Sequence, residues 1–137
     1  MQSLEIKAFK NELRNYNYLC SRIVSLENSI EFCYDRLGGV RAIDPSKEPV
    51  HAMPNKELEY KLRDDISKFE ALLAQKVAQK VEIDRTLDRM EKDVREAVFK
   101  VYAMGYSCVK VADEYFLSST GLQKRMNKAI KEALREI

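Results

Sequence analysis

Two long runs of apolar residues at helical spacing constrain this chain more than any other feature. The first run lies in residues 4–37 and the second in residues 58–90, and in both the apolar positions recur mostly every three or four residues. That spacing places the side chains on one face of a helix, which then needs a surface to pack against. The apolar positions are Phe9, Leu13, Tyr16, Cys20, Ile23, Leu26, Ile30, Cys33 and Leu37 in the first run, and Leu58, Leu62, Ile66, Phe69, Leu73, Val77, Val81, Ile83, Leu87 and Met90 in the second.

The simplest packing pairs the two runs with each other. A long antiparallel hairpin of coiled-coil type buries both apolar stripes and leaves the charged faces in solvent. Four aromatic residues lie partly off the stripes and leave room for a second hairpin, so we expect the arm to support a homodimer. These residues are Tyr18, Phe32, Tyr34 and Tyr60.

The segment between the runs carries turn and loop residues. Gly38 and Gly39 are expected to end the first helix, because glycine weakens a helix and readily forms its left-handed cap. All three prolines of the chain follow by position 54, and Asn55 can cap the second helix. Residues 38–55 are therefore expected to form a long irregular loop, to which the sequence assigns no role.

The composition supports an all-α fold. Charged residues make up 34% of the 137 positions, and there are only four glycines and three prolines, which favours long helices over sheets. No stretch approaches the roughly 20 apolar residues needed to cross a bilayer, and the first residues do not resemble a signal peptide. The sequence thus predicts a cytoplasmic protein with no membrane partner.

Few residues are available for catalysis or metal binding. Cys20, Cys33 and Cys108 are far apart and form no CxxC pair, so we expect reduced and mostly buried thiols. The only histidine, His51, lies between two prolines in the expected loop and has no second ligand nearby. The sequence therefore predicts no enzymatic activity, no metal site and no cofactor.

The last third of the chain changes to shorter apolar clusters. We place a boundary between an arm, residues 1–90, and a small C-terminal domain, residues 91–137, in which Asp93 can cap a helix over residues 94–104. Turns at residues 105–107 and 116–118 then separate that helix from two more, over residues 108–115 and 119–137. Ser107 and Ser118 are placed to cap them. This order of elements is that of a helix-turn-helix, with apolar contacts expected from Val111, Ala112, Tyr115, Leu117 and Leu122.

The final helix is the most basic part of the chain. Residues 118–137 carry five Lys and Arg against two Glu, which leaves +3, whereas the whole chain has 24 against 22 and a net charge of +2. A cationic helix at the end of a helix-turn-helix favours binding to duplex DNA.

The same region resembles a known family. The pattern consists of Tyr102-Ala103-Met104-Gly105-Tyr106-Ser107, Val111-Ala112, Leu117-Ser118 and the ending Ala129-Ile130-Lys131-Glu132-Ala133-Leu134. It resembles the fourth region of bacterial sigma factors and is most similar to the ArpU/RinA-type transcriptional regulators of phages and prophages, over roughly residues 85–137. The resemblance implies a last helix that enters the major groove and, as host, a bacterium or its phage. A regulator of this kind is expected to recruit or block RNA polymerase.

Two positions depart from the family pattern. Phe116 occupies a tight turn where the family usually has glycine, and we expect a different turn geometry because a bulky residue at positive φ is strained. Arg125 occupies a position that is usually aliphatic and faces the core, so Met126 is expected to point inward instead. The predicted buried stripe is Leu122, Met126, Ala129, Ile130 and Ala133.

Candidate DNA contacts follow from the position of each residue in the motif. The exposed residues at the start of a recognition helix meet base edges first, where Gln and Asn can pair with adenine and Lys with guanine. These are Ser119, Thr120, Gln123, Lys124 and Asn127. Lys128, Lys131 and, on the preceding helix, Lys110 are better placed for phosphates, which position a protein without reading sequence.

Two other functions fit the same features. One is a DNA-packaging recognition subunit of the small-terminase kind, which would assemble as a ring. The other is a protein-interaction module whose helix-turn-helix is degenerate, which Phe116 and Arg125 would explain. Regulation of phage transcription by a homodimer is the first of the three hypotheses.

Overall fold

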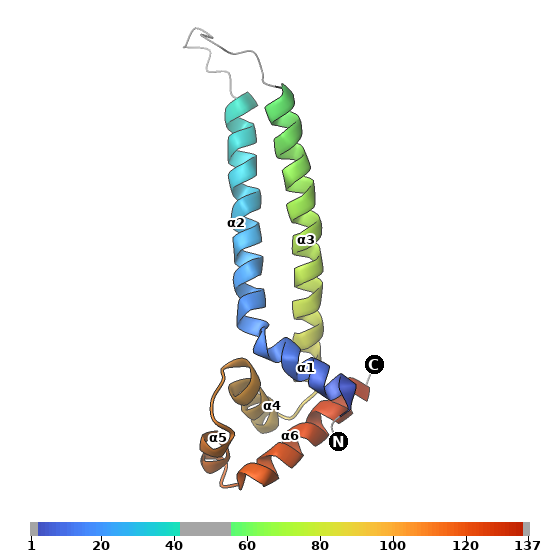
Figure 1. Cartoon of the computed structure of the whole chain (residues 1–137), viewed down its shortest axis with the longest axis vertical. Coiled ribbons are helices and arrows are strands. Elements are labelled where there is room, and N and C mark those ends of the chain that lie inside the picture. Colours follow the sequence, from blue (N-terminus) through green and yellow to red (C-terminus); the bar gives the residue numbers. More distant parts are fainter. Residues whose placement is uncertain (1–2, 42–55, 136–137) are drawn as a thin grey trace. The chain divides into compact units, whose positions relative to one another are not determined.

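The computed structural model describes residues 3–41 and 56–135, and this part of the chain consists of helices joined by short turns, with no strand (Figure 1). The prediction of an all-α fold is confirmed. The elements are α1 (Leu4–Arg14), α2 (Tyr16–Arg41), α3 (Lys56–Asp88), α4 (Lys92–Val98), a π-helix η1 (Phe99–Ala103), α5 (Cys108–Glu114) and α6 (Ser119–Arg135). Within the described ranges, none of the helices is both long and apolar enough to cross a membrane.

The chain forms two compact units. One contains Met1–Cys20 together with Ala78–Ile137, and the other contains Ser21–Val77. These units do not follow the predicted division at residue 90, although α3 does end close to it, at Asp88. Residues from both ends of the chain, rather than the C-terminal residues alone, build the unit that contains α5 and α6.

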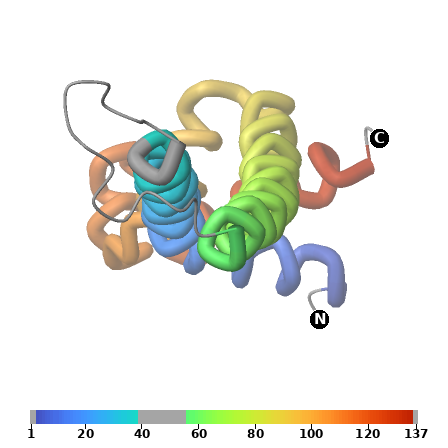
Figure 2. Tube along the Cα trace, turned by 90° about the horizontal axis from the view of Figure 1, so that it is seen from above, coloured from blue at the N-terminus to red at the C-terminus, as the bar shows by residue number. Residues whose placement is uncertain are grey.

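The unit Ser21–Val77 is the predicted antiparallel hairpin. Its parts of α2 and α3 run side by side in both views (Figures 1 and 2). Cys33 and Leu37 of α2 are buried in one cluster with Leu62 and Ile66 of α3. Leu58 and Phe69 of α3 are partly buried against this cluster. The three- and four-residue spacing therefore identified the stripe that joins the two helices.

The predicted end of the first helix at Gly38-Gly39 is wrong. Helix α2 continues through both glycines and ends at Arg41. A glycine costs a helix only about 1 kcal/mol relative to alanine, and Leu37, directly before Gly38, is buried against α3. The greater part of the expected loop, with its prolines and His51, lies outside the described residues, as does Asn55.

The first apolar run is not one helix. Helix α1 ends at Arg14 and is followed by the C-cap residue Asn15, whose Nδ2 and backbone N–H donate to the carbonyl oxygen of Asn11 at 3.0 and 3.2 Å. An asparagine side chain competes with the helical hydrogen bonds in this way and favours a break. Because of the break, Phe9 and Leu13 are buried where α1 contacts η1 and α6, and not in the arm as predicted.

The helix predicted for residues 94–104 also differs in detail. It begins at Lys92, and Glu91, not Asp93, occupies the N-cap position without a side-chain cap bond. From Phe99 the backbone widens into the π-helix η1, which ends at Ala103. Such π segments occur often at functional or strained positions. Gly105, at φ 76°, then makes the predicted turn into α5, since glycine alone adopts positive φ freely.

The cysteines agree with the expectation of free thiols. All three are unpaired; Cys33 is buried, while Cys20 and Cys108 are half-buried.

Candidate nucleic-acid interface

Helices α5 and α6 are joined by a tight turn whose backbone is fixed by hydrogen bonds. The amides of Tyr115 and Leu117 donate to the carbonyl of Ala112 at 3.1 and 2.9 Å, and that of Phe116 donates to Asp113 at 3.2 Å. Phe116 has a φ of 58° and is 96% exposed. The expectation that Phe116 would avoid positive φ is therefore wrong: the chain keeps the tight turn and places the strained residue in solvent.

Serine caps one of the two helices as predicted. The Oγ of Ser118 accepts from the amide of Gly121 at 3.0 Å, which satisfies a free N–H at the start of α6. Ser107 occupies the N-cap position of α5, but its side chain makes no cap bond, unlike the prediction.

The inner face of α6 anchors the helix. Leu122, Met126, Ile130 and Ala133 are buried, with Met126 and Ile130 fully so, and Ala129 is half-buried. Met126 thus takes the inward position, as expected, and Arg125 is exposed. On α5, Val111 and the small Ala112 are buried, and Tyr115 and Leu117 are half-buried. Helix α5 contacts α6.

The outer face of α6 carries a row of cations, which we call the α6 cationic stripe: Lys124, Lys128, Lys131 and Arg135. They are spaced by four, three and four residues, which puts them on one side of the helix over about 16 Å. All four are exposed, and none pairs with an acid in the described part of the chain. The stripe includes Arg135, which the sequence interpretation had counted in the charge but not among the contacts.

The remaining predicted contacts are distributed around the start of α6. Thr120 and Gln123 are exposed, and with Lys124 they occupy positions i, i+3 and i+4, so they share a side of the helix. Ser119 is half-buried, and its carbonyl oxygen accepts from the Sγ of Cys108 at 3.7 Å. Lys110 is exposed on α5.

Asn127 is differently placed from the other candidates. It is half-buried, and its Oδ1 accepts a hydrogen bond from the Nζ of Lys10 on α1 at 2.6 Å. A bidentate contact to adenine needs the amide oxygen as an acceptor, so such a contact would compete with Lys10. Its role in DNA binding stays a prediction.

Lys10 holds α1 against α6 from a buried position. It is only 4% exposed, and its ammonium also lies 5.0 Å from the centre of the Tyr102 ring. Burial, together with the nearby Arg14, lowers the pKa of Lys10. Sequence reasoning missed this residue, although a signal exists: Lys10 shares its face of α1 with the buried Ile6, Phe9 and Leu13.

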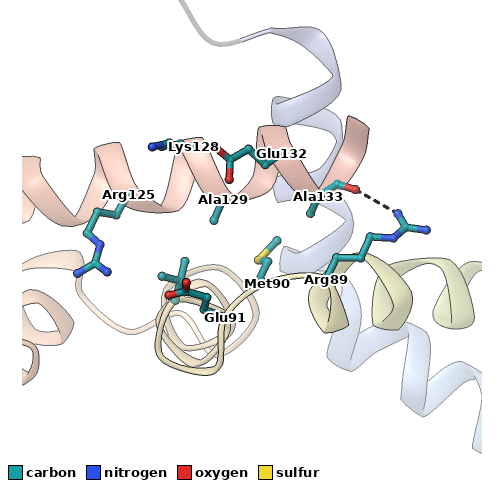
Figure 3. Close-up of a pocket in the computed structure, with 9 residues that line it drawn as sticks. Arg89, Met90, Glu91, Arg125, Lys128, Ala129, Glu132 and Ala133 are labelled. Atoms are coloured by element: carbon teal, nitrogen blue, oxygen red, sulfur yellow. Dashed lines mark hydrogen bonds between the residues drawn. The ribbon is translucent and has the colours of Figure 1, made fainter. Parts of the chain in front are cut away.

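A cavity of about 420 Å³ lies on another side of α6 (Figure 3). Its wall combines the segment from Arg89 to Val94 with the α6 residues Arg125, Lys128, Ala129, Glu132 and Ala133. The side chain of Arg89, the residue directly after α3, donates to the carbonyl of Ala133 of α6 at 3.1 Å. The lining combines cations and carboxylates with apolar residues, among them Met90 and Val94.

In residues 3–41 and 56–135, no group of three or more His, Cys, Asp or Glu side chains is placed to hold a metal ion.

Fold and site together define an all-helical protein with a paired helical arm and a helix-turn-helix whose second helix, α6, presents a cationic outer face. The chain matches no protein-family model, no curated protein and no solved structure.

Proposed function

We propose that this protein binds duplex DNA through α5, the turn and α6. The observation that carries the proposal is the α6 cationic stripe, four exposed cations on one side of a helix whose opposite side is fully anchored. Cations without a protein partner gain most from meeting phosphates, because each contact releases condensed counterions. A solvated basic face is the ordinary alternative, but the preceding short helix and tight turn are the context in which such a helix enters the major groove.

Two sets of residues would make two kinds of DNA contact, one with phosphates and one with bases. Lys128, Lys131 and Arg135, with Lys110 on α5, would hold phosphates. Thr120, Gln123 and Lys124 at the start of α6 would meet base edges. Because Met126 and Ile130 fix the inner face and Lys10 holds Asn127, little backbone order has to be gained on binding.

The biological role proposed is regulation of phage or prophage transcription in the cytoplasm of a bacterial host, with no catalytic activity of its own. The resemblance of residues 85–137 to ArpU/RinA-type regulators supports this role, and RNA polymerase would be a further partner. A homodimer joined through the arms would present two copies of α6 to successive half-sites.

DNA binding is tested by fluorescence anisotropy with a duplex selected from a random pool, over a series of salt concentrations. Lys124→Ala and Lys128→Ala should each weaken binding, and each lost phosphate contact should reduce the log-log salt slope by about 0.9. Lys61→Ala removes an exposed lysine from α3 and serves as the matched control. Absence of binding at low salt, or equal affinity of all three variants, would refute the proposal.

A further inference from the structure

One flank of the arm carries an open groove between α2 and α3. It has a volume of about 730 Å³ and is lined from both helices within the unit Ser21–Val77. The lining residues that matter are Ser25, Ser29, Phe32 and Arg36 of α2, and Asp65 and Phe69 of α3. Those of α2 are spaced by four, three and four residues, so they form one face of that helix.

The groove combines an apolar centre with small and charged borders. Phe32 is 60% exposed, although it is a large apolar residue, and Phe69 is half-buried. Ser25 and Ser29 have short side chains that allow another helix to approach closely. The guanidinium of Arg36 lies 5.7 Å from the centre of the Phe32 ring. Neither Arg36 nor Asp65 forms an ion pair with any residue that the structure describes.

The groove carries a positive charge on its α2 border and a negative charge on its α3 border, so it is complementary to a second copy of itself. Because α2 and α3 are antiparallel and Cys33 and Leu37 share a cluster with Leu62 and Ile66, Arg36 and Asp65 lie at similar heights on opposite borders. A twofold rotation about an axis parallel to the arm exchanges the two borders. Such a rotation brings each Arg36 to the Asp65 of the other copy, and the two Phe32 side chains towards the two Phe69 side chains.

We propose that this groove is the dimer interface and that its occupant is the same groove of a second copy. In the resulting four-helix bundle, α2 of one copy packs against α3 of the other, and every neighbouring pair of helices is antiparallel. The two copies point the same way along the axis, so both chains leave the bundle at the same end. This inference rests on the dimer named in the proposed function but does not depend on DNA binding.

The test is the mass of the full chain in the absence of DNA, measured by sedimentation equilibrium over a range of concentrations. The wild type should be a dimer, and Phe32→Ser should raise the dimer dissociation constant by about tenfold or more. Tyr60→Ser replaces another exposed aromatic residue, which lies on α3 outside the groove, and should leave the constant unchanged.

Charge reversal tests whether the twofold axis pairs Arg36 of one copy with Asp65 of the other. Arg36→Asp and Asp65→Arg should each weaken the dimer, and the double variant should restore it, while helical content by circular dichroism stays at the wild-type level. A monomer at all concentrations, a ring of higher mass, a dimer insensitive to Phe32→Ser, or no rescue in the double variant would each overturn the inference. Since no DNA is present, these results are independent of whether the α6 cationic stripe binds a duplex.

Discussion

Lys10 and Asn127, which are 117 positions apart, are joined by a hydrogen bond of 2.6 Å from Nζ to Oδ1. This bond fixes the N-terminal helix α1 to the middle of α6. No carboxylate pairs with Lys10 among the described residues, so the Asn127 oxygen and the ring of Tyr102 are what stabilise its buried charge. Removing either partner should therefore have unequal effects.

Asn127→Ala should lower the free energy of unfolding by about 1–3 kcal/mol, because it leaves a buried ammonium without its acceptor. Lys10→Met should cost less, since it removes the charge whose burial is unfavourable and keeps an apolar chain of similar length. Urea unfolding at neutral pH measures both values. A larger loss for Lys10→Met than for Asn127→Ala would contradict this account.

The stability of the same unit should depend on alkaline pH through Tyr16. Burial, followed by the hydrogen bond from its hydroxyl to Asp84 at 2.8 Å, raises the pKa of Tyr16 to about 12. The unfolded chain loses this proton near pH 10, before the folded chain does. The contribution of Tyr16 is thus complete below pH 10 and is lost as the pH rises through 12.

Tyr16→Phe should accordingly make the free energy of unfolding less steeply dependent on pH between 10 and 12 than it is in the wild type. Unfolding by urea at several pH values in this window gives the slope. Tyr106→Phe alters an exposed tyrosine of the same unit and is the control. If both variants keep the wild-type slope, the Tyr16–Asp84 bond does not contribute as described.

Local chemistry explains what the sequence predicted well. The apolar positions that pair α2 with α3, the turn at Gly105 and the cap at Ser118 each depend on residues close together in the chain. The inward position of Met126 also followed from spacing alone, because its neighbours Leu122 and Ile130 set the buried face.

Some of the failed predictions depend on distant partners. An apolar stripe does not state which surface it meets, so Phe9 and Leu13 were assigned to the arm although they pack near η1 and α6. The Lys10 to Asn127 bond could not be foreseen for the same reason. The sequence indicated only that Phe32 lies off the apolar stripe. That Phe32 and Asp65 line one groove depends on the register of the two helices.

The passage of α2 through Gly38 gives a direct prediction. A Cβ added there would have no atom within 4 Å, apart from the chain neighbours and the helix's own backbone, and the position is helical. Gly38→Ala should therefore raise the free energy of unfolding by about 1 kcal/mol. Gly105→Ala should lower it by a similar amount, because Gly105 has a φ of 76°. A loss of stability in Gly38→Ala, measured by thermal and urea unfolding, would show that the helix does not continue as described.

The turn at Phe116 should be more stable without its side chain. At a φ of 58° a residue with a Cβ is strained, and the ring, being 96% exposed, has no packing to lose. Phe116→Gly should raise the free energy of unfolding by about 0.5–1 kcal/mol, as the strain relieved exceeds the added flexibility of the unfolded chain. Phe116→Ala removes the ring but keeps the Cβ, so it should leave stability nearly unchanged and serves as the control. A gain in Phe116→Ala equal to that in Phe116→Gly would place the cost in the exposed ring and not in the backbone.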